Sequence, residues 1–432
     1  MHFLRGILGL LSLVGLAWLL STNRRRFPIK IVLGGTILQF ALALLVLKTG
    51  SGRAVFDVIG ELVTLILRGA DAGANFVFGP LAGNHPAVTW KAIAGIKIMT
   101  TIIVFSTLSA IGYHFGILQR VVAALAFVMT RLLGVSGAES LSCAANVFLG
   151  QTEAPLLVRP YIAGMTRSEL MAVMTGGFAT IAMGVMAVYV DWLGVGPDGQ
   201  PDPVRAIAAA RHLLTASLMS APAAFVMAKV MLPETQAAST AGHVKVERMS
   251  DAKNALDAAT SGATQGMVLA INVLAMLIAF IALITLVDLA LTWLGQRGFM
   301  AVWLARCGTD RLDLDTLLGW LFSPIAYLVG VDAGDRRAFG SLLGTAMATN
   351  EMVAYGKLSE LIKSAGMSER SIRMATYSLC GFANFSSMGI QIAGIGGMAP
   401  SRRPDLVSLA PRAMLGGAMA SWMTGCIAGM LT

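Results

Sequence analysis

Charged side chains are scarce in this chain of 432 residues. Asp, Glu, Lys and Arg together make up 13% of it and hydrophobic residues 56%, whereas ordinary soluble domains carry about 25% charged residues. So few ionised groups cannot cover the surface of a globular protein. The composition therefore excludes a soluble enzyme, a disordered chain and a nucleic-acid-binding protein, despite a net charge of +9.

Cysteine clusters and catalytic motifs are also lacking. The chain has four scattered cysteines: Cys143, Cys307, Cys380 and Cys426. None belongs to a Cys-x-x-Cys pair, which favours buried thiols over disulfides or metal ligands. There is no His-Glu-x-x-His zinc motif and no phosphate-binding Gly-x-x-x-x-Gly-Lys-Ser/Thr loop. We therefore expect neither direct use of ATP nor an enzyme.

Long apolar runs are abundant instead, and runs of about 20 residues indicate membrane-spanning helices. Eight segments qualify: Phe3–Ser21, Ile31–Leu47, Ile93–Leu118, Leu170–Val190, His212–Met231, Gly266–Val287, Met374–Pro400 and Leu406–Leu431. Basic residues in short loops set their orientation, because Lys and Arg stay in the cytoplasm. The basic loops 24–30, 245–253 and 401–404 then lie inside, and the acidic loop 196–202 lies outside. This topology places both termini outside.

Several shorter segments fit the membrane surface or a partial crossing. Val55–Leu67 has an apolar face and a charged face, as in an interfacial helix. Leu118–Leu133 and Leu314–Val331 are flanked by polar residues and are also predicted to be interfacial. Segments 137–163 and 337–363 are moderately apolar and carry polar groups in their middles. Re-entrant hairpins would explain both.

Segments 118–232 and 312–431 share a series of landmarks in the same order. Each has a glycine-rich turn, a glutamate about 20 residues later, a Gly-Phe-Ala run and a Met-Gly pair. An odd number of predicted spans separates the two hairpins, so the second copy enters from the opposite face. An inverted repeat with interrupted helices is typical of secondary transporters, whose site lies near the bilayer midplane.

Glu153 and Glu351 each lie where a predicted hairpin reverses. A carboxylate at membrane depth is costly unless it faces a cavity or a partner. Either glutamate could simply tie its hairpin to a neighbouring helix. The ligand interpretation is favoured because Gln151, Thr152 and Asn350 crowd the same two tips.

Polar residues also follow both Gly-Phe-Ala runs. Thr180 follows the first, and Asn384 and Ser387 follow the second. We expect the spans 170–190 and 374–400 to be unwound at these points. The alternative is that the polar side chains only hold helices together.

An intramembrane protease and a channel are the alternatives to a transporter. Gly134–Gly137 reads Gly-Val-Ser-Gly, which matches the serine motif of rhomboid-type intramembrane proteases. Such a serine needs a histidine from another span, and the candidates are His114 and His212. The second copy has Asp332 and Ala333 there, so the motif reads better as a turn. A channel is also possible, but inverted hairpins favour alternating access.

Five stretches of the chain resemble the concentrative nucleoside transporter family. They are Asn146–Leu156, Ser217–Pro222, Asn350–Tyr355, Cys380–Ser387 and Ala399–Arg403. The resemblance covers about residues 90–432, and residues 1–90 fit by topology. It implies an all-α elevator transporter in a bacterial inner membrane, assembled as a homotrimer. Each protomer would import a nucleoside together with a cation.

The resemblance also implies a division of the chain and of the site. Residues 1–117 and 233–311 would form the scaffold, and 118–232 with 312–432 would form the transport domain. The nucleobase set would be Gln151, Thr152, Glu153 and Val185. The ribose set would be Glu351, Phe382, Asn384 and Ser387. This division is chemically sensible, because ribose hydroxyls donate well to a carboxylate and base edges carry both donors and acceptors.

A sodium site is implied at the side chains of Asn146 and Thr180 and the carbonyls of Leu149 and Ile181. These are hard oxygen ligands that can replace the water shell of the ion. Two alternatives stay open: a carrier for another small polar solute such as a nucleobase, and proton coupling through Glu153 or Glu351. The sequence does not rank purine against pyrimidine nucleosides.

Overall fold

The computed structural model describes residues 2–82, 93–196, 198, 200–238, 240, 252–306, 309 and 311–431. Within these ranges all regular structure is helical, apart from an isolated bridge between Val195 and Pro201. The predicted all-α fold class is confirmed. Most of the predicted basic loop 245–253 lies outside the described residues.

The chain begins with elements that precede the repeat. These are α1 (His2–Leu19), α2 (Ile29–Lys48), α3 (Gly50–Phe78), η1 (Gly79–Leu81) and α4 (Ala94–His114). Helix α3 contains the predicted amphipathic segment and extends beyond it at both ends. Gly60 and Val63 are buried in it, whereas Val58 and Leu62 are 64% and 53% exposed. One face of α3 therefore packs on the protein and the other presents apolar side chains outward.

The two predicted repeats share an order of a first helix, a hairpin, an interrupted helix and a long last helix, and differ in their short elements. The first comprises α5 (Ile117–Leu133), α6 (Gly137–Asn146), η2 (Ala154–Val158), α7 (Arg159–Ile162), α8 (Arg167–Ala179), α9 (Met183–Leu193) and α10 (Pro203–Met231). The second comprises α13 (Leu314–Val329), α14 (Arg336–Ala348), α15 (Glu351–Lys363), α16 (Glu369–Ser378), α17 (Phe385–Met398), η3 (Pro400–Arg402) and α18 (Arg403–Leu431). Each copy starts with a helix that ends at a left-handed glycine, Gly134 or Gly330. Each ends with a 29-residue helix that contains an internal proline.

The described residues contain seven helical segments that are long and apolar enough to cross a membrane. They match seven of the eight predicted spans. The eighth, Met374–Pro400, consists of α16 and α17 separated by a non-helical stretch, so neither piece reaches a full span. The first copy has the equivalent break, between α8 and α9. The predicted unwinding of both segments is confirmed.

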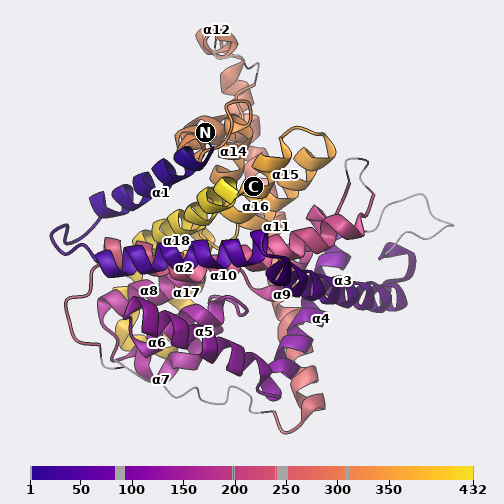
Figure 1. The fold of residues 1–432 in the computed structure, drawn as a ribbon. Helices are drawn as coiled ribbons and strands as arrows, with labels where there is room; N and C mark the ends of the chain where they lie inside the picture. Colours follow the sequence, from indigo (N-terminus) through magenta and orange to yellow (C-terminus); the bar gives the residue numbers. More distant parts are fainter. Residues whose placement is uncertain are drawn as a thin grey trace.

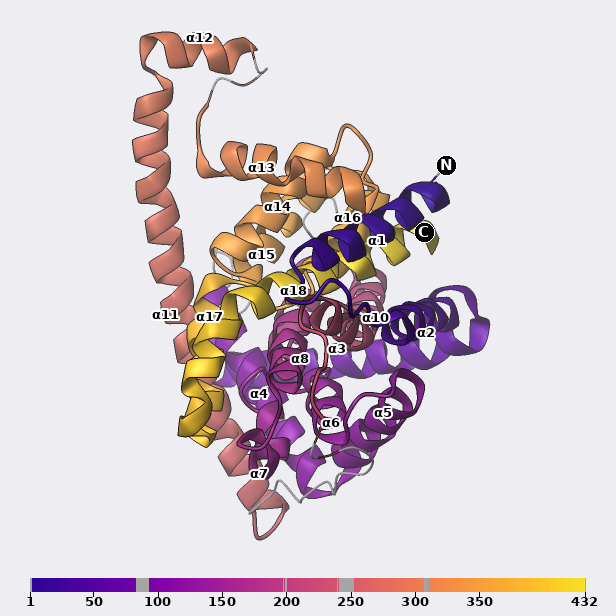
Figure 2. The ribbon, with the colours of Figure 1, turned by 90° about the vertical axis from the view of Figure 1, so that its left-hand side faces the viewer.

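The hairpins of the two copies lie at opposite ends of the molecule, as expected for an inverted repeat. Figure 1 shows α5, α6 and α7 at one end and α14 and α15 at the other, and Figure 2 shows α13 beside α14 and α15. Between the copies in sequence are α11 (Ala255–Gly295) and α12 (Gly298–Arg306). With 41 residues, α11 is much longer than the predicted span Gly266–Val287. It packs mainly against α4 and runs along the outside of the molecule (Figure 2).

Candidate functional site

The first predicted hairpin is built from α6 and an irregular return. Helix α6 ends at Asn146, and the chain turns through residues 147–153 before it runs back beside α6. The return consists of the short 3-10 helix η2 and the single turn α7. Pro155 and Pro160 explain this, since proline lacks the N–H that a continuous α-helix needs. The tip therefore exposes backbone and polar side chains rather than a closed helix.

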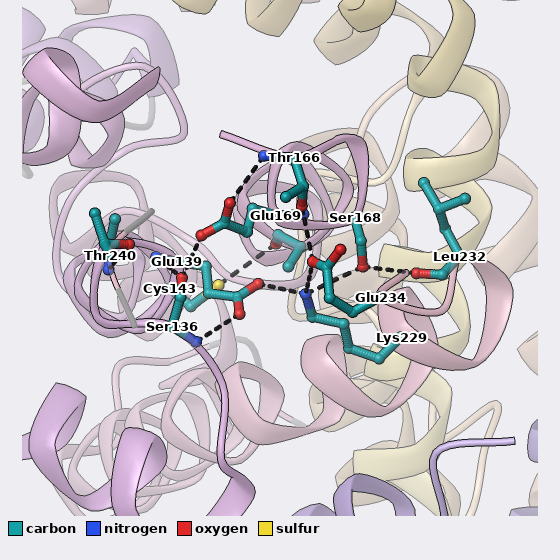
Figure 3. A network of polar contacts seen from close by, with 12 residues as sticks. Ser136, Glu139, Cys143, Thr166, Ser168, Glu169, Lys229, Leu232, Glu234 and Thr240 are labelled. Atoms are coloured by element: carbon teal, nitrogen blue, oxygen red, sulfur yellow. Dashed lines mark hydrogen bonds and ion pairs between the residues drawn. The ribbon is translucent and has the colours of Figure 1, made fainter. Parts of the chain in front are cut away.

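A buried polar network holds the base of this hairpin (Figure 3). The Lys229 ammonium of α10 lies 2.7 Å from the Glu139 carboxylate of α6, and both side chains are almost fully buried. The Ser136 hydroxyl donates to Glu169 of α8 at 2.6 Å. Lys229 also donates to Ser168 at 3.1 Å. These contacts join α6, α8 and α10, so the three helices position the tip of the hairpin as one unit.

Replacing Lys229 with methionine is expected to destabilise the protein by about 3–5 kcal/mol, because Glu139 would keep a buried charge without a partner. The measurement is the midpoint of thermal unfolding in detergent. The matched control is Lys357→Met. The ion pair of Lys357 with Asp315 is partly exposed, so its loss should destabilise the protein by only about 0–1 kcal/mol. Adding Glu139→Gln to Lys229→Met should restore part of the loss. A double variant that is no more stable than Lys229→Met would contradict this account.

The serine of the protease-like motif belongs to this same network. Ser136 caps α6: its hydroxyl accepts from the Glu139 N–H, and its own N–H donates to the Glu139 carboxylate. His212 instead lies 3.1 Å from the Tyr377 hydroxyl. The serine therefore serves as a helix cap, and the motif is a turn.

The second hairpin is α14 and α15, which meet at Thr349 and Asn350. Asn350 caps α15: its Oδ1 accepts a hydrogen bond from the Val353 N–H at 2.9 Å, so this oxygen is used by the start of the helix. Glu351 follows it and is 5% exposed. The Asn384 amide donates to one oxygen of Glu351 at 3.0 Å. Two of the predicted ribose residues are therefore in direct contact.

Asn384 lies where the chain re-enters a helix after the break. Its Oδ1 accepts from the Ser387 N–H at 2.9 Å and from the Ser386 hydroxyl at 2.7 Å. It thereby caps α17 and keeps its Nδ2 for Glu351. Ser387 is buried, and Phe382, two residues before Asn384, is half-buried. The four predicted ribose residues thus come from one hairpin tip and one helix break.

The sequence did not single out Tyr189, which completes this group. The Tyr189 hydroxyl donates to the other oxygen of Glu351 at 2.9 Å, and its ring stacks on Tyr355 at 4.2 Å between centroids. The Tyr355 hydroxyl in turn donates to the Thr376 carbonyl. Tyr189 lies one helical turn from Val185 on α9, so that helix face links the predicted base and ribose groups.

The two helix breaks lie against each other. A side chain at Gly381 would come within 2.6 Å of the Phe178 carbonyl oxygen, so only glycine allows this approach. The Ser421 hydroxyl of α18 lies 3.0 Å from the Cys380 carbonyl and 3.4 Å from the Ala179 carbonyl. One side chain therefore bonds to both unwound segments.

Two of the predicted base residues, Gln151 and Thr152, lie against α17, at the tip of the first hairpin. Thr152 packs against Gly394, where a Cβ would lie 2.8 Å from the threonine methyl. Gln151 is buried and bonds to Gln391, a second residue that the sequence did not single out. Seven residues of helix, about 10 Å, separate Gln391 from Asn384. This spacing is comparable to the length of one base and one sugar side by side.

Glu153 opens onto a cavity of about 430 Å³ between the hairpin tip and helices α4 and α11. Tyr113, Ser261 and Gln265 line its far side. This volume lies in the range of small-molecule sites. Two larger cavities, of about 740 and 760 Å³, adjoin the bases of the hairpins and contain none of the predicted site residues.

The predicted sodium ligands lie at the end of α6 and at the first helix break. Asn146 is fully buried; its Nδ2 donates to the Ser142 carbonyl, and its Oδ1 has no hydrogen-bond partner among the described residues. Thr180 is also buried and donates to the Gly176 carbonyl at 2.9 Å. The Met183 N–H donates to Phe148, which joins the tip to the break. A free amide oxygen in such a place fits the coordination of a hard cation.

A helical protein with an inverted repeat, two interrupted helices in contact and buried polar ligands is built like a secondary transporter. Three family models match the chain: "Na+ dependent nucleoside transporter C-terminus" over residues 212–429, "Na+ dependent nucleoside transporter N-terminus" over 8–81, and "Nucleoside recognition" over 95–195. The chain therefore belongs to the Na+-dependent (concentrative) nucleoside transporter family. It is a multi-pass membrane transporter and not an enzyme.

Relatives match along the whole chain. An uncharacterized transporter of Haemophilus influenzae is 39% identical, and the match covers 100% of this chain and 98% of that one. The uncharacterized transporter YutK of Bacillus subtilis is 37% identical over 100% of both. Solute carrier family 28 member 3 of Rattus norvegicus is 39% identical over 98% of this chain, which spans 58% of that longer protein.

Solved structures of the transporter CNTnw share the fold. One in an inward-facing, substrate-bound state has a TM-score of 0.86 at 35% identity and covers 100% of this chain and 98% of that one. A variant in an outward-facing state has a TM-score of 0.87 at 34% identity, with the same coverage. The architecture is therefore common to both states of that protein.

Proposed function

We propose that the protein is a sodium-coupled symporter that imports nucleosides. The observation that carries this proposal is the Glu351 carboxylate, held by Tyr189 and Asn384 between a hairpin tip and a helix break. A carboxylate so oriented is suited to accept hydrogen bonds from the vicinal hydroxyls of a ribose. A free nucleobase has no ribose hydroxyls to donate to this carboxylate. The arrangement therefore favours nucleosides over nucleobases.

We further propose that Gln151, Thr152, Glu153 and Val185 contact the base, and that Glu351, Phe382, Asn384 and Ser387 hold the ribose. The spacing along α17 and the cavity beside Glu153 support this division. Sodium would bind Asn146, Thr180 and the carbonyls of Leu149 and Ile181. The support for that site is the unpartnered Asn146 Oδ1.

An elevator movement and a homotrimer are parts of the same proposal. The network around Lys229 and the contact between the helix breaks support a rigid transport body formed by 118–232 and 312–432. Residues 1–117 and 233–311 would form the scaffold. Helix α11 contacts α4 and otherwise exposes apolar side chains such as Ile278 and Leu289, which suits contact with lipid and with partner protomers. The setting would be a bacterial inner membrane, with both termini outside.

Uptake and counterflow in proteoliposomes test the function. A panel of nucleosides, with and without sodium, should show saturable uptake that requires sodium. A 2′,3′-dideoxynucleoside should be a poor substrate, because it lacks the hydroxyls that Glu351 accepts. Equal transport of the dideoxynucleoside and its parent would exclude the ribose contact, and transport of free bases in preference to nucleosides would favour the nucleobase carrier.

A further inference from the structure

Gln391 is a fully buried amide in an otherwise apolar stretch of α17. Its Nε2 donates to the Met174 backbone carbonyl at 3.1 Å and to Gln151 Oε1 at 3.0 Å. The contact joins α17 of the second repeat to the tip of the first hairpin. Gln391 therefore acts directly on a residue proposed to contact the base.

The backbone carbonyl fixes which way both amides point. A carbonyl only accepts hydrogen bonds, so the end of Gln391 that faces Met174 must be its NH2 group. The second N–H of that group points to Gln151, which must accept the hydrogen bond with its amide oxygen. If Gln151 were flipped, two NH2 groups would face each other. Gln151 is therefore held with Oε1 toward Gln391.

The other end of Gln151 is left for a ligand. No hydrogen bond from Gln151 Nε2 is formed within the part of the chain that the structure describes. Next to it in the hairpin, Glu153 accepts from the Gly150 N–H with one oxygen. The tip thus presents an N–H donor from Gln151 and a carboxylate acceptor from Glu153.

Stability alone does not account for Gln391. Its Oε1 is buried and has no partner among the described residues, which carries a desolvation cost. A leucine or methionine at this place would avoid that cost and fill a similar volume. The polar contact with Gln151 is what the glutamine adds.

We propose that Gln391 is a positioning residue that sets the base preference of the transporter. By fixing Gln151 as a donor, it favours bases that present a carbonyl oxygen at that edge, such as uracil, over bases that present an amino group, such as cytosine. This inference rests on the proposed contact between Gln151 and the base.

Replacement of Gln391 with methionine tests the inference. Without Gln391 the Gln151 amide can turn and offer its oxygen to an amino group. We expect the preference for uridine over cytidine, measured as the ratio of their dissociation constants for purified protein, to fall about fivefold or more. A merely structural role would weaken both nucleosides by the same factor, and that result would overturn the proposal. Gln391→Leu provides a second variant of different shape if the methionine variant does not fold.

Repeating the test in a Gln151→Ala variant distinguishes a failure of this inference from a failure of the proposed base contact. In Gln151→Ala, adding Gln391→Met should leave the uridine-to-cytidine ratio unchanged, because the residue that it orients is gone. A further change in the ratio would overturn the positioning role. If Gln151→Ala itself leaves the binding of both nucleosides unaltered, the base contact in the proposed function is wrong, and this inference falls with it. If Gln151→Ala weakens binding but Gln391→Met leaves the ratio unchanged, only the inference fails.

Discussion

Replacing Glu351 with glutamine is expected to weaken nucleoside binding about tenfold or more. The variant keeps the shape of the side chain but removes the charge-assisted hydrogen bonds to the ribose, worth roughly 1.5–3 kcal/mol. It also disturbs the group itself, because Tyr189 and Asn384 both donate to this carboxylate and one oxygen would become an NH2. The measurement is equilibrium binding of uridine to purified protein, followed by uptake in proteoliposomes.

The matched control for this variant is Glu360→Gln on the same helix. Glu360 is exposed, and among the described residues its carboxylate pairs only with Lys363, so its replacement should leave binding unchanged. The thermal midpoint of each variant shows whether the fold is intact. Near-normal binding of uridine by a well-folded Glu351→Gln protein would contradict the assignment of Glu351 to the ribose.

Replacing Asn146 with leucine is expected to abolish most sodium-driven uptake. The change removes the one buried side-chain oxygen of the proposed site that has no partner among the described residues. We expect the affinity for sodium to fall by at least roughly 10–100-fold, because the loss of even an outer partner of a metal ligand has an effect of that size. Nucleoside binding should weaken with it, because the site adjoins the tip that carries Gln151. The measurement is uptake in vesicles at fixed pH as sodium is exchanged for choline.

Gln39 of α2 offers a matched control for Asn146. It too is a fully buried amide that donates to the carbonyl four residues earlier, and its Oε1 is likewise unpartnered among the described residues. Gln39→Leu should therefore leave the sodium dependence intact. If uptake by the unaltered protein survives complete removal of sodium and follows a pH gradient, the ion assignment is wrong. Coupling would then have to involve Glu153 or Glu351.

The interrupted helices were predictable because polar and small residues are easily recognised within an apolar run. Thr180 and Asn384 lie in the breaks, and Glu351 lies at the tip of its hairpin. The length of α11 was underestimated because its first turns, from Ala255, are built of small and polar residues that do not extend the apolar run. Hydropathy locates the part of a helix that suits lipid, whereas the helix itself ends where its hydrogen bonds end.

The partners of the site were harder to predict than its members. Tyr189 lies in an apolar helix, and nothing local distinguishes it from an aromatic packing residue. Gln391 did carry a signal, since it is a lone amide in an apolar span. Lys229 and Glu139 are also isolated charges, but they lie far apart in sequence, and only the fold brings them to 2.7 Å. Side chains that orient other side chains are defined by tertiary contacts and not by motifs.

The bond from Ser421 to both helix breaks has a thermodynamic consequence. Its hydroxyl lies 3.0 Å from the Cys380 carbonyl and 3.4 Å from the Ala179 carbonyl, so the two unwound segments, proposed to hold base and sugar, cannot separate without breaking this contact. A site that keeps one geometry has one intrinsic affinity, whichever compartment it faces. In the proposed symport, a difference in apparent nucleoside affinity between the two faces must then come from a difference in ion occupancy. Under the proposed elevator mechanism, protein held in either facing state at the same sodium concentration is therefore expected to bind the nucleoside with the same dissociation constant.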